Sequence, residues 1–384
     1  MQITRLETVP VRVPLKPGLT TRTAHGPHSV SQYVIVRVHT DTGLVGLGEA
    51  TVSAIWSGET SRGCVAAIEQ CIGPALIGSD PREINALRQR MDEAIKFNPF
   101  TKAAVEMALW DLAGKAAGVP VYQLLGGKVR GSIPIKMMIG AFDPPQAVEL
   151  AQRFLKWGVR CLKVKVGIDP ASDLARVKAV REAAGPKIPM TVDANCGWDT
   201  ATARRMVREL AAFDLLFIEQ PIPSGDPDAL ADVRRASTVP IMADESVWAL
   251  TDAWTVAKAQ AADIISVYPG KNGAIANTVE IVHAAKAAGL LCHLGSNLEL
   301  GVGSAAMLHV AAALPEIASE LYPADIIGPN YHESDLLKEP LKLGPEFAIV
   351  LDGAGLGVEL YEDKLERWKD RSDSSERRAS SHGP

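Results

Sequence analysis

Four residues with chemically useful side chains follow one another at a nearly constant spacing. They are Lys165, Asp193, Glu219 and Asp244, at intervals of 28, 26 and 25 residues. Each stands at the end of a short apolar run, and such intervals are typical of one β-strand followed by one helix. If these runs are parallel strands of one barrel, the three acidic side chains meet at one rim. Because close carboxylates do not all stay ionised without a cation, the pattern predicts a divalent metal site beside a lysine.

The types of ligand favour Mg²⁺, with Mn²⁺ as the alternative, because three carboxylates without His or thiolate make an oxygen site. Such an ion would stabilise the charge that develops when a proton leaves the carbon next to a carboxylate. Lys165 would be the base, with Lys163 on the same side of the strand. We expect the two cationic neighbours, Lys163 and the metal, to lower the pKa of the Lys165 amine.

Two further polar residues stand next to these ligands. Asn195 follows Asp193 by two positions, so both side chains point to the same side of the strand. Glu245 is adjacent to Asp244, so only one of the two faces the barrel interior. We expect Asp244 to be the ligand, with Asn195 and Glu245 supporting the metal site from behind.

The elements that position these residues repeat with a regular period. Eight apolar runs with amphipathic stretches between them are centred near Met137, Val164, Val192, Phe217, Met242, Ser266, Cys292 and Glu320. The runs are apolar throughout, as parallel strands buried on both faces are. This pattern predicts an α/β fold, a (β/α)₈ TIM-like barrel over residues 126–325.

The remaining segments have different patterns. Residues 1–125 begin with strand-like alternation and a hairpin whose turn lies at Asp41 to Gly43, and then become helical, which predicts an N-terminal α+β capping domain. We expect residues 326–361 to return to this domain. Residues 362–384 are polar and are expected to be disordered.

Composition excludes several classes of partner. The chain has 384 residues, of which 47% are hydrophobic and 22% charged, with a net charge of −5. The lack of a basic stripe argues against nucleic acid, and the lack of a long apolar run argues against a membrane. The five cysteines are scattered without a C-x-x-C pair, which suggests a reducing compartment. With no signal peptide, the expected location is cytoplasmic.

Four motifs in order resemble the signature of the enolase superfamily. They are Lys163-Val-Lys165, Asp193-Ala-Asn195, Glu219-Gln-Pro221 and Asp244-Glu245-Ser246. The match is to its muconate lactonizing enzyme (muconate cycloisomerase) subgroup, within the mandelate racemase/muconate lactonizing enzyme family. The Mg²⁺ and lysine base of such sites are a known pattern. The resemblance covers nearly the whole chain.

The resemblance implies roles for particular residues. Asp193, Glu219 and Asp244 would bind Mg²⁺, Lys165 would be the acid and base, and Lys163 would orient it or bind the substrate carboxylate. Loops of the capping domain would close over a small carboxylic acid and set specificity. The substrate contacts expected on this ground are His25, Trp56, Tyr268, Lys271, Asn297 and Glu299. A homo-oligomer is expected.

One departure from the subgroup bears on the reaction. A second lysine usually stands on the sixth strand, 24 residues after the third ligand, where this chain has Tyr268. Racemisation needs a base on each face of the substrate, and Lys271 would serve only if its loop turned it inward. We therefore expect one-base chemistry. The leading reaction is cycloisomerisation (lactonisation) of an unsaturated dicarboxylic acid, and the alternative is dehydration of a hydroxy or sugar acid.

Weaker alternatives remain at this stage. An epimerase is disfavoured by Tyr268. A barrel that binds acids without turnover would keep the metal site. A nicotinamide oxidoreductase would rest on the glycine string from Gly301 to Ala306, which follows a late strand and is a weak dinucleotide signal.

Overall fold

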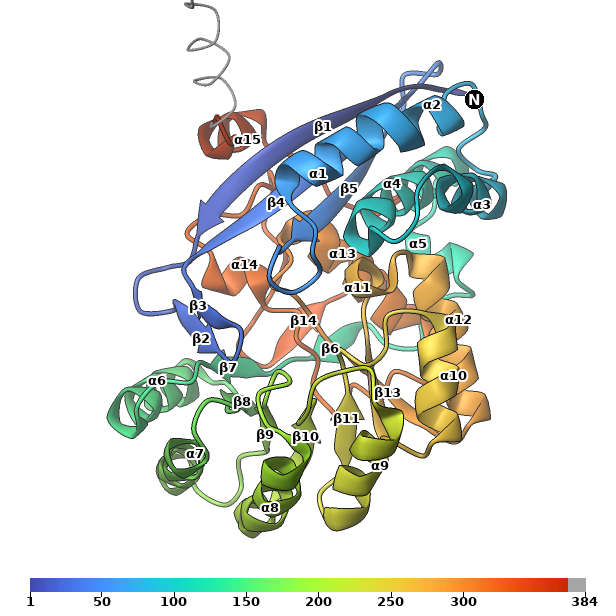
Figure 1. Cartoon of the computed structure of the whole chain (residues 1–384). Helices are drawn as coiled ribbons and strands as arrows, with labels where there is room; N and C mark the ends of the chain where they lie inside the picture. The colour runs from blue at the N-terminus through green and yellow to red at the C-terminus, as the bar shows by residue number, and fades with distance from the viewer. Residues whose placement is uncertain (372–384) are drawn as a thin grey trace, which may run out of the picture.

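The computed structural model describes residues 1–371, in which an α+β domain lies above a barrel of parallel strands (Figure 1). The elements of the α+β domain alternate between a short sheet and helices. They are β1 (Ile3–Pro14), β2 (Thr21–Thr23), β3 (Gly26–His28), β4 (Val30–Thr40), β5 (Val45–Val52), α1 (Ser61–Ala67), the π-helical turn η1 (Ile68–Ile72), α2 (Gly73–Leu76), α3 (Ile84–Ala94), α4 (Pro99–Ala117) and α5 (Val121–Leu124). This confirms the expected α+β capping fold.

The sheet of this domain has the order β1-β4-β5 and is antiparallel. The predicted hairpin is present as β4 and β5. Helix α4 packs so closely on β5 that a Cβ atom on Gly48 would lie 1.7 Å from the carbonyl oxygen of Ala104. A glycine is therefore required where this strand meets the helix.

The barrel strands lie side by side in sequence order, with seven strands in one parallel sheet. They are β7 (Met137–Ile139), β8 (Leu162–Lys165), β9 (Met190–Asp193), β10 (Leu215–Glu219), β11 (Ile241–Ala243), β12 (Ile264–Val267) and β13 (Leu291–Leu294). Seven of the eight predicted runs are thus confirmed. Their side chains are almost all buried, as expected for strands that are covered on both faces.

The predicted eighth strand, near Glu320, does not form, which corrects that part of the prediction. Residues 319–321 form a turn, and the segment closes the ring through single parallel bridges from Ile317 to Cys292 and from Ala324 to Ile135. Polar and charged residues interrupt the apolar run here, so a regular strand does not form. The ring is nevertheless continued from β13 back toward β7.

Helices cover the outside of the barrel strands (Figure 1). They are α6 (Pro144–Trp157), α7 (Pro170–Ala184), α8 (Thr200–Leu210) with the 3₁₀ turn η2 (Ala211–Phe213), α9 (Pro227–Ala236), α10 (Leu250–Lys258), α12 (Ile275–Ala287) and α13 (Gly301–Ala313). The short helix α11 (Pro269–Asn272) follows β12 and packs on α4 of the capping domain. Four successive helices, α6 to α9, start at an aspartate whose carboxylate accepts the backbone N–H of the residue three positions later. These N-caps fix the residue at which each strand-to-helix loop ends. They therefore help to hold the loops at the rim of the barrel in place.

Two buried glutamates of the capping domain hold it onto the barrel. Glu49 on β5 accepts the N–H groups of Leu300 and Gly303, at 2.7 and 3.0 Å, at the start of α13. Glu106 on α4 accepts the N–H groups of Ile275 and Ala276, at 2.8 and 3.0 Å, at the start of α12. Each carboxylate caps a barrel helix whose terminal N–H groups otherwise lack partners.

The C-terminal segment returns to both parts of the molecule. Its elements are α14 (Gly328–Tyr331), β14 (Phe347–Ile349), which pairs with β6 (Ser132–Pro134), and α15 (Glu362–Trp368). Helix α15 corrects the expectation of disorder from residue 362, because Leu365 is buried against a cluster that includes β1 and β4. The rest of the predicted disordered tail, 372–384, lies outside the described residues.

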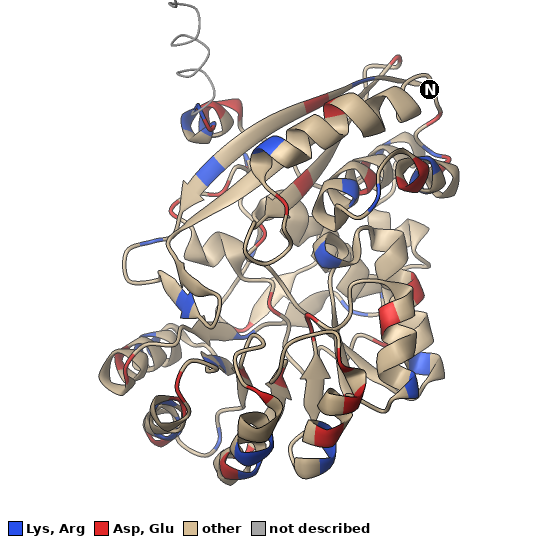
Figure 2. Cartoon of the chain, viewed as in Figure 1, with Lys and Arg blue, Asp and Glu red and all other residues tan. Residues whose placement is uncertain are grey.

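The surface carries charges of both signs. Both basic and acidic residues occur on the outer helices of the barrel (Figure 2). Among the described residues, no helix combines the length and the apolar character that a membrane crossing requires.

Candidate active site

The barrel register brings the predicted residues to one level. Lys165 pairs with Asp193 across β8 and β9, and Asp193 pairs with Glu219 across β9 and β10. Paired residues of parallel neighbours point to the same face, so these side chains all point into the barrel mouth. Asp244 follows the last residue of β11 and joins them at the same rim.

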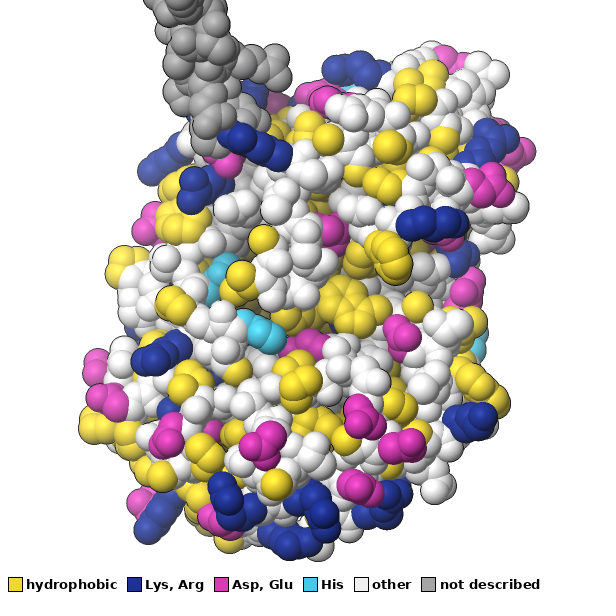
Figure 3. Space-filling view, in the orientation of Figure 1, with side chains coloured by type: hydrophobic (Ala, Val, Ile, Leu, Met, Phe, Trp, Pro, Cys, Tyr) yellow, Lys and Arg dark blue, Asp and Glu magenta, His cyan; other side chains and the backbone are white. Residues whose placement is uncertain are grey.

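A cavity that is partly open to solvent lies between the rim and the capping domain. Its rim wall contains both lysines and all three predicted ligands. Its outer wall comes from the β2–β3 hairpin, and Ser53, Ile55 and Trp56 from the loop after β5 complete it. Figure 3 shows histidine side chains in the hollow between the two parts of the molecule. The cavity is therefore shared by the barrel and the capping domain.

The two lysines of β8 hold different partners. The Lys165 Nζ donates to Asp193 Oδ2 at 2.5 Å and to Asn195 Oδ1 at 2.8 Å. The Lys163 Nζ lies 2.8 Å from Glu219 Oε2 and donates to Asp325 Oδ2 at 2.8 Å. Burial alone would lower the pKa of Lys163, but the surrounding carboxylates outweigh it and hold that pKa well above its usual value.

The three rim carboxylates repel one another. Burial, followed by the charge of Asp193, raises the pKa of Glu219 to about 8. Burial also raises the pKa of Asp244 to about 6, although the nearby Lys271 opposes the shift. Both carboxylates are therefore in surroundings where a further positive charge would be stabilising.

The donor set fits a hard divalent cation. In the described residues, no three side chains of the usual ligand types are gathered closely enough to hold a metal ion as they stand. Asp193, Glu219 and Asp244 are each paired with a lysine instead. All three still line one cavity, and a cation there would relieve the repulsion that raises the pKa of Glu219. Such a cation would compete with the lysines for these oxygens.

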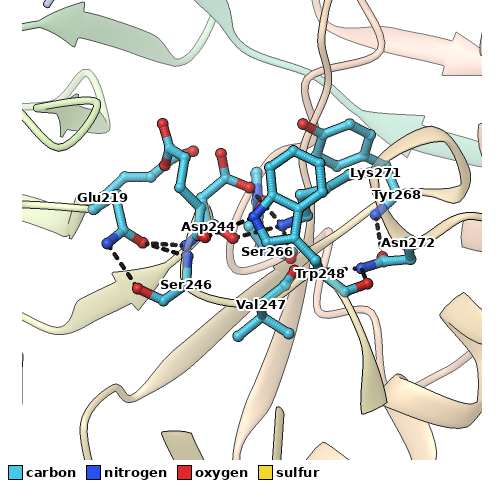
Figure 4. A network of polar contacts seen from close by, with 12 residues as sticks. Glu219, Asp244, Ser246, Val247, Trp248, Ser266, Tyr268, Lys271 and Asn272 are labelled. Carbon is cyan, nitrogen blue, oxygen red and sulfur yellow. Dashed lines mark hydrogen bonds and ion pairs between the residues drawn. The ribbon is translucent and has the colours of Figure 1, made fainter. Parts of the chain in front are cut away.

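Asp244 is held from behind by a dense polar network (Figure 4). The Lys271 Nζ donates to Asp244 Oδ1 at 2.7 Å, to the Asp244 carbonyl at 2.8 Å and to the Ser266 carbonyl at 2.7 Å. The side-chain oxygen of Gln220 accepts the N–H groups of Asp244 and Ser246. Lys271 thus uses all three of its N–H bonds to fix the loop after β11.

Glu245 connects the capping domain to the rim. Its Oε1 atom lies 3.3 Å from His25 Nε2, and it accepts from Trp56 Nε1 at 3.3 Å and from Asn195 Nδ2 at 3.1 Å. Burial opposes ionisation, but the hydrogen bonds from His25 and Asn195, with the charge of Lys165, outweigh it and hold the pKa of Glu245 at about 2. One carboxylate oxygen therefore meets both capping loops and the residue that contacts Lys165.

Tyr268 directly follows the end of β12, at the position where the sequence resemblance led us to look for a second lysine. Its side chain is buried, and its ring stacks on that of Trp56 with centroids 6.3 Å apart. Its hydroxyl has no hydrogen-bond partner in the described structure. Burial, reinforced by nearby carboxylates, holds the pKa of Tyr268 well above its usual value. The hydroxyl therefore keeps its proton and is not suited to act as a base.

The predicted substrate contacts divide into two groups. His25, Trp56 and Asn297 line the cavity, as expected. Tyr268, Lys271 and Glu299 are buried and lie outside its lining, and their contact with substrate stays a prediction. Lys271 instead fixes Asp244, and Glu299 accepts hydrogen bonds from Ser296 and from the Asn297 N–H in its own turn.

Sequence reasoning missed Asp325, which lines the cavity and bonds Lys163. It follows the eighth unit, where no apolar run marks a strand end. The acidic residue in Pro-Ala-Asp-Ile-Ile-Gly, one barrel period beyond β13, was the available signal. Sequence reasoning also missed Lys136, a lone cation within the apolar stretch that leads into β7.

Comparison with known proteins gives matches along nearly the whole chain. The family model described as the N-terminal domain of mandelate racemase / muconate lactonizing enzyme matches residues 3–126. The model described as enolase C-terminal domain-like matches residues 146–364.

Individual relatives differ in the reactions that their names give. The chain is 35% identical to muconate cycloisomerase 1 of Rhodococcus opacus, over 96% of this chain and 98% of that protein. It is 32% identical to the N-succinyl-L-Arg/Lys racemase of Bacillus cereus, over 95% and 97%. The crystal structure of a dipeptide epimerase from Cytophaga hutchinsonii, complexed with Mg and the dipeptide D-Ala-L-Val, superposes with a TM-score of 0.91. It is 31% identical and covers 96% of this chain and 99% of that one.

Proposed function

This chain belongs to the mandelate racemase/muconate lactonizing enzyme family of the enolase superfamily, whose enzymes take a proton from the carbon next to a carboxylate, and we propose that Lys165 is its only base. The observation that carries this proposal is the lack of a free lysine at the end of the sixth strand, β12. Tyr268 stands where the subgroup usually has a lysine, and Lys271 is committed to Asp244. Proton transfer then takes place at one face of the substrate.

A second base is disfavoured for each candidate residue. Lys271 is fully buried, and its three N–H bonds all point to acceptors of the protein. Tyr268 would have to lose its proton beside several carboxylates, and they raise its pKa. Racemases need a competent base on both faces, so the racemase and epimerase names among the relatives are not the best fit for this chain.

The roles of the rim residues follow from their contacts. Lys165 would exchange the proton, and Asn195 would hold its ammonium in the cavity. Lys163 would meet the substrate carboxylate. Asp193, Glu219 and Asp244 would hold Mg²⁺, or Mn²⁺, which when bound would stabilise the negative charge on the substrate carboxylate. The capping loops that carry His25 and Trp56 would keep water out of the cavity.

The leading reaction is cycloisomerisation of an unsaturated dicarboxylic acid. One carboxylate oxygen of the substrate would add to the double bond, and Lys165 would give a proton to the carbon next to the other carboxylate. One base suffices for this reaction. Thr21, Thr23 and His28 of the β2–β3 hairpin line the outer wall, where the second carboxylate would be recognised by neutral donors.

A second candidate is favoured by one observation, the unpartnered hydroxyl of Tyr268. In dehydration of a hydroxy acid, Lys165 would take the proton next to the carboxylate. The C–O bond at the next carbon would break, Lys165 would return the proton to the departing hydroxide, and the Tyr268 hydroxyl would donate a hydrogen bond to that oxygen. A phenol that keeps its proton is suited to donate such a hydrogen bond.

The experiment uses purified enzyme with Mg²⁺ and two sets of probes. Loss of ultraviolet absorbance by cis,cis-muconate and its chlorinated forms reports cycloisomerisation, and 2-keto acid formation from a panel of sugar acids reports dehydration. We expect K165M to abolish the observed reaction and K115M, which removes a lysine remote from the cavity, to retain it. Y268F should lower cycloisomerisation less than about 3-fold and dehydration by at least about 10-fold.

Two results would contradict the proposal. Turnover that survives in K165M would remove Lys165 as the base. Binding of these acids with Mg²⁺, but without turnover or exchange of the proton for deuterium in heavy water, would favour a barrel that only binds acids.

A further inference from the structure

A second charged cluster lies in the barrel interior behind the cavity. Its centre is Lys136, whose side chain is fully buried. The Lys136 Nζ lies 2.6 Å from His293 Nε2 and donates to the carbonyl of Pro323 at 2.6 Å. Asp325 Oδ1 is 3.0 Å away. Two hydrogen-bond contacts and one ion pair thus surround the buried ammonium group and hold it in place.

His293 takes part as a neutral acceptor. Burial, together with the charge of Lys136, holds the pKa of His293 well below its usual value. Its Nε2 atom can therefore accept from the ammonium group. The lysine is thus fixed to β13 and to the segment that replaces the eighth strand, two elements that close the barrel.

Asp325 bridges two lysines with its two oxygens. Oδ1 faces Lys136 at 3.0 Å, and Oδ2 accepts from Lys163 at 2.8 Å. The other close partners of Lys163 are Glu219 at 2.8 Å and Asp193 at 3.5 Å. Those two carboxylates are among the three proposed to hold a divalent cation. Of these three acidic partners of Lys163, Asp325 is therefore the one that is not proposed to bind the metal.

The four connected residues differ in whether they line the cavity. Lys163 and Asp325 line the cavity, whereas Lys136 and His293 do not. Lys136 is therefore within reach of the substrate site only through Asp325. Without Lys136, the inner oxygen of Asp325 would face a buried space with no cation, and the carboxylate would be free to turn.

We propose that Lys136 is a positioning residue, which fixes the Asp325 carboxylate so that it holds Lys163 in place to receive the substrate carboxylate. This inference rests on the proposed function for the role of Lys163. The contacts from Lys136 to Lys163 do not depend on which acid is the substrate.

The test compares K136M, D325N and the double variant with the unmodified enzyme. In crystal structures, we expect K136M to show Asp325 turned or Lys163 displaced from it. With the probe acid that the unmodified enzyme converts, K136M should lower kcat/KM by at least about 10-fold, because small misplacements of a binding group are costly. Adding K136M to D325N should change kcat/KM by less than about 2-fold, because Lys136 acts through Asp325.

K115M is the matched control, because Lys115 also pairs with a buried carboxylate, Asp111 at 2.6 Å, but in the capping domain. It should lower the unfolding temperature and leave kcat/KM nearly unchanged. A K136M structure with Asp325 and Lys163 still paired, or an equal loss of kcat/KM in the D325N background, would overturn the inference. If none of the probe acids is converted, the proposed function fails, and the crystal structures still decide the role of Lys136.

Discussion

Buried carboxylates of the capping domain and of the barrel rim have opposite kinds of partner. Glu49 and Glu106 accept backbone N–H groups at the starts of helices α13 and α12. Asp193 and Glu219 face lysines and one another at the cavity. Both sets are almost inaccessible to solvent, so burial alone does not distinguish a structural acid from a functional one.

The difference lies in whether the partners are exchangeable. A backbone N–H at a helix terminus cannot leave without unfolding the turn, so the capping carboxylates join two domains permanently. A lysine ammonium on a flexible side chain can give up its place to a cation or a substrate. The rim carboxylates thus repel one another in the folded protein. Their partners are lysines, which a cation or a substrate can replace during a reaction.

Replacing a rim carboxylate should have the largest effect. We expect E219Q to lower turnover by about 10³-fold or more, because it removes a metal ligand and a contact of Lys163. The unfolding temperature without divalent ions should not fall, because the substitution also removes mutual repulsion. Steady-state kinetics and thermal unfolding of one preparation measure both quantities. A clear loss of stability with activity retained would place Glu219 in the structural set.

Replacing a capping carboxylate should have the converse effect. Glu106 accepts hydrogen bonds from two backbone N–H groups and from the Trp110 indole, whereas glutamine offers one acceptor oxygen. We expect E106Q to lower the free energy of unfolding by about 1–3 kcal/mol. At temperatures where the variant is folded, kcat should stay within about 3-fold. Denaturant unfolding gives the first quantity, and a large loss of kcat in folded protein would contradict the comparison.

Stability should also depend on pH through Glu49. Burial raises the pKa of Glu49 from 4.5 to about 8 in the folded state. The folded protein then binds a proton more tightly than the unfolded chain, so the contribution of Glu49 is complete below pH 4.5 and is lost as pH rises toward 8. The slope for one proton is about 1.4 kcal/mol per pH unit. E49Q should show a shallower fall of stability over this window, and an unchanged slope would count against the assignment.

The contact between His25 and Glu245 should have the smallest effect. It is one of three contacts to the same oxygen, and the His25 side chain is 27% exposed. We expect H25A to raise KM about 2–5-fold, with kcat nearly unchanged, because the β2–β3 hairpin would be held less firmly over the cavity. Steady-state kinetics measure this split. A fall of kcat comparable to that of E219Q would mean that His25 takes part in the chemistry.

The sequence predicted what depends on the period of the chain. Asp193 and Glu219 end buried strands, so the strand period alone places them at one level of the barrel mouth. The Lys136–Asp325 contact could not be predicted, because it joins opposite ends of the barrel sequence and depends on how the ring closes. The contact of the Lys271 side chain with Asp244 could not be predicted either, because it depends on the conformation of the turn after β12.

Stereospecific exchange in heavy water tests the central claim most directly. An acid with a proton next to its carboxylate, in each mirror-image form, is incubated with enzyme and Mg²⁺, and the position and configuration of incorporated deuterium are determined. With Lys165 as the only base, deuterium should enter one enantiomer with its configuration retained, and the other enantiomer should stay unlabelled. Deuterium in both enantiomers, with their interconversion, would show a second base and contradict this account.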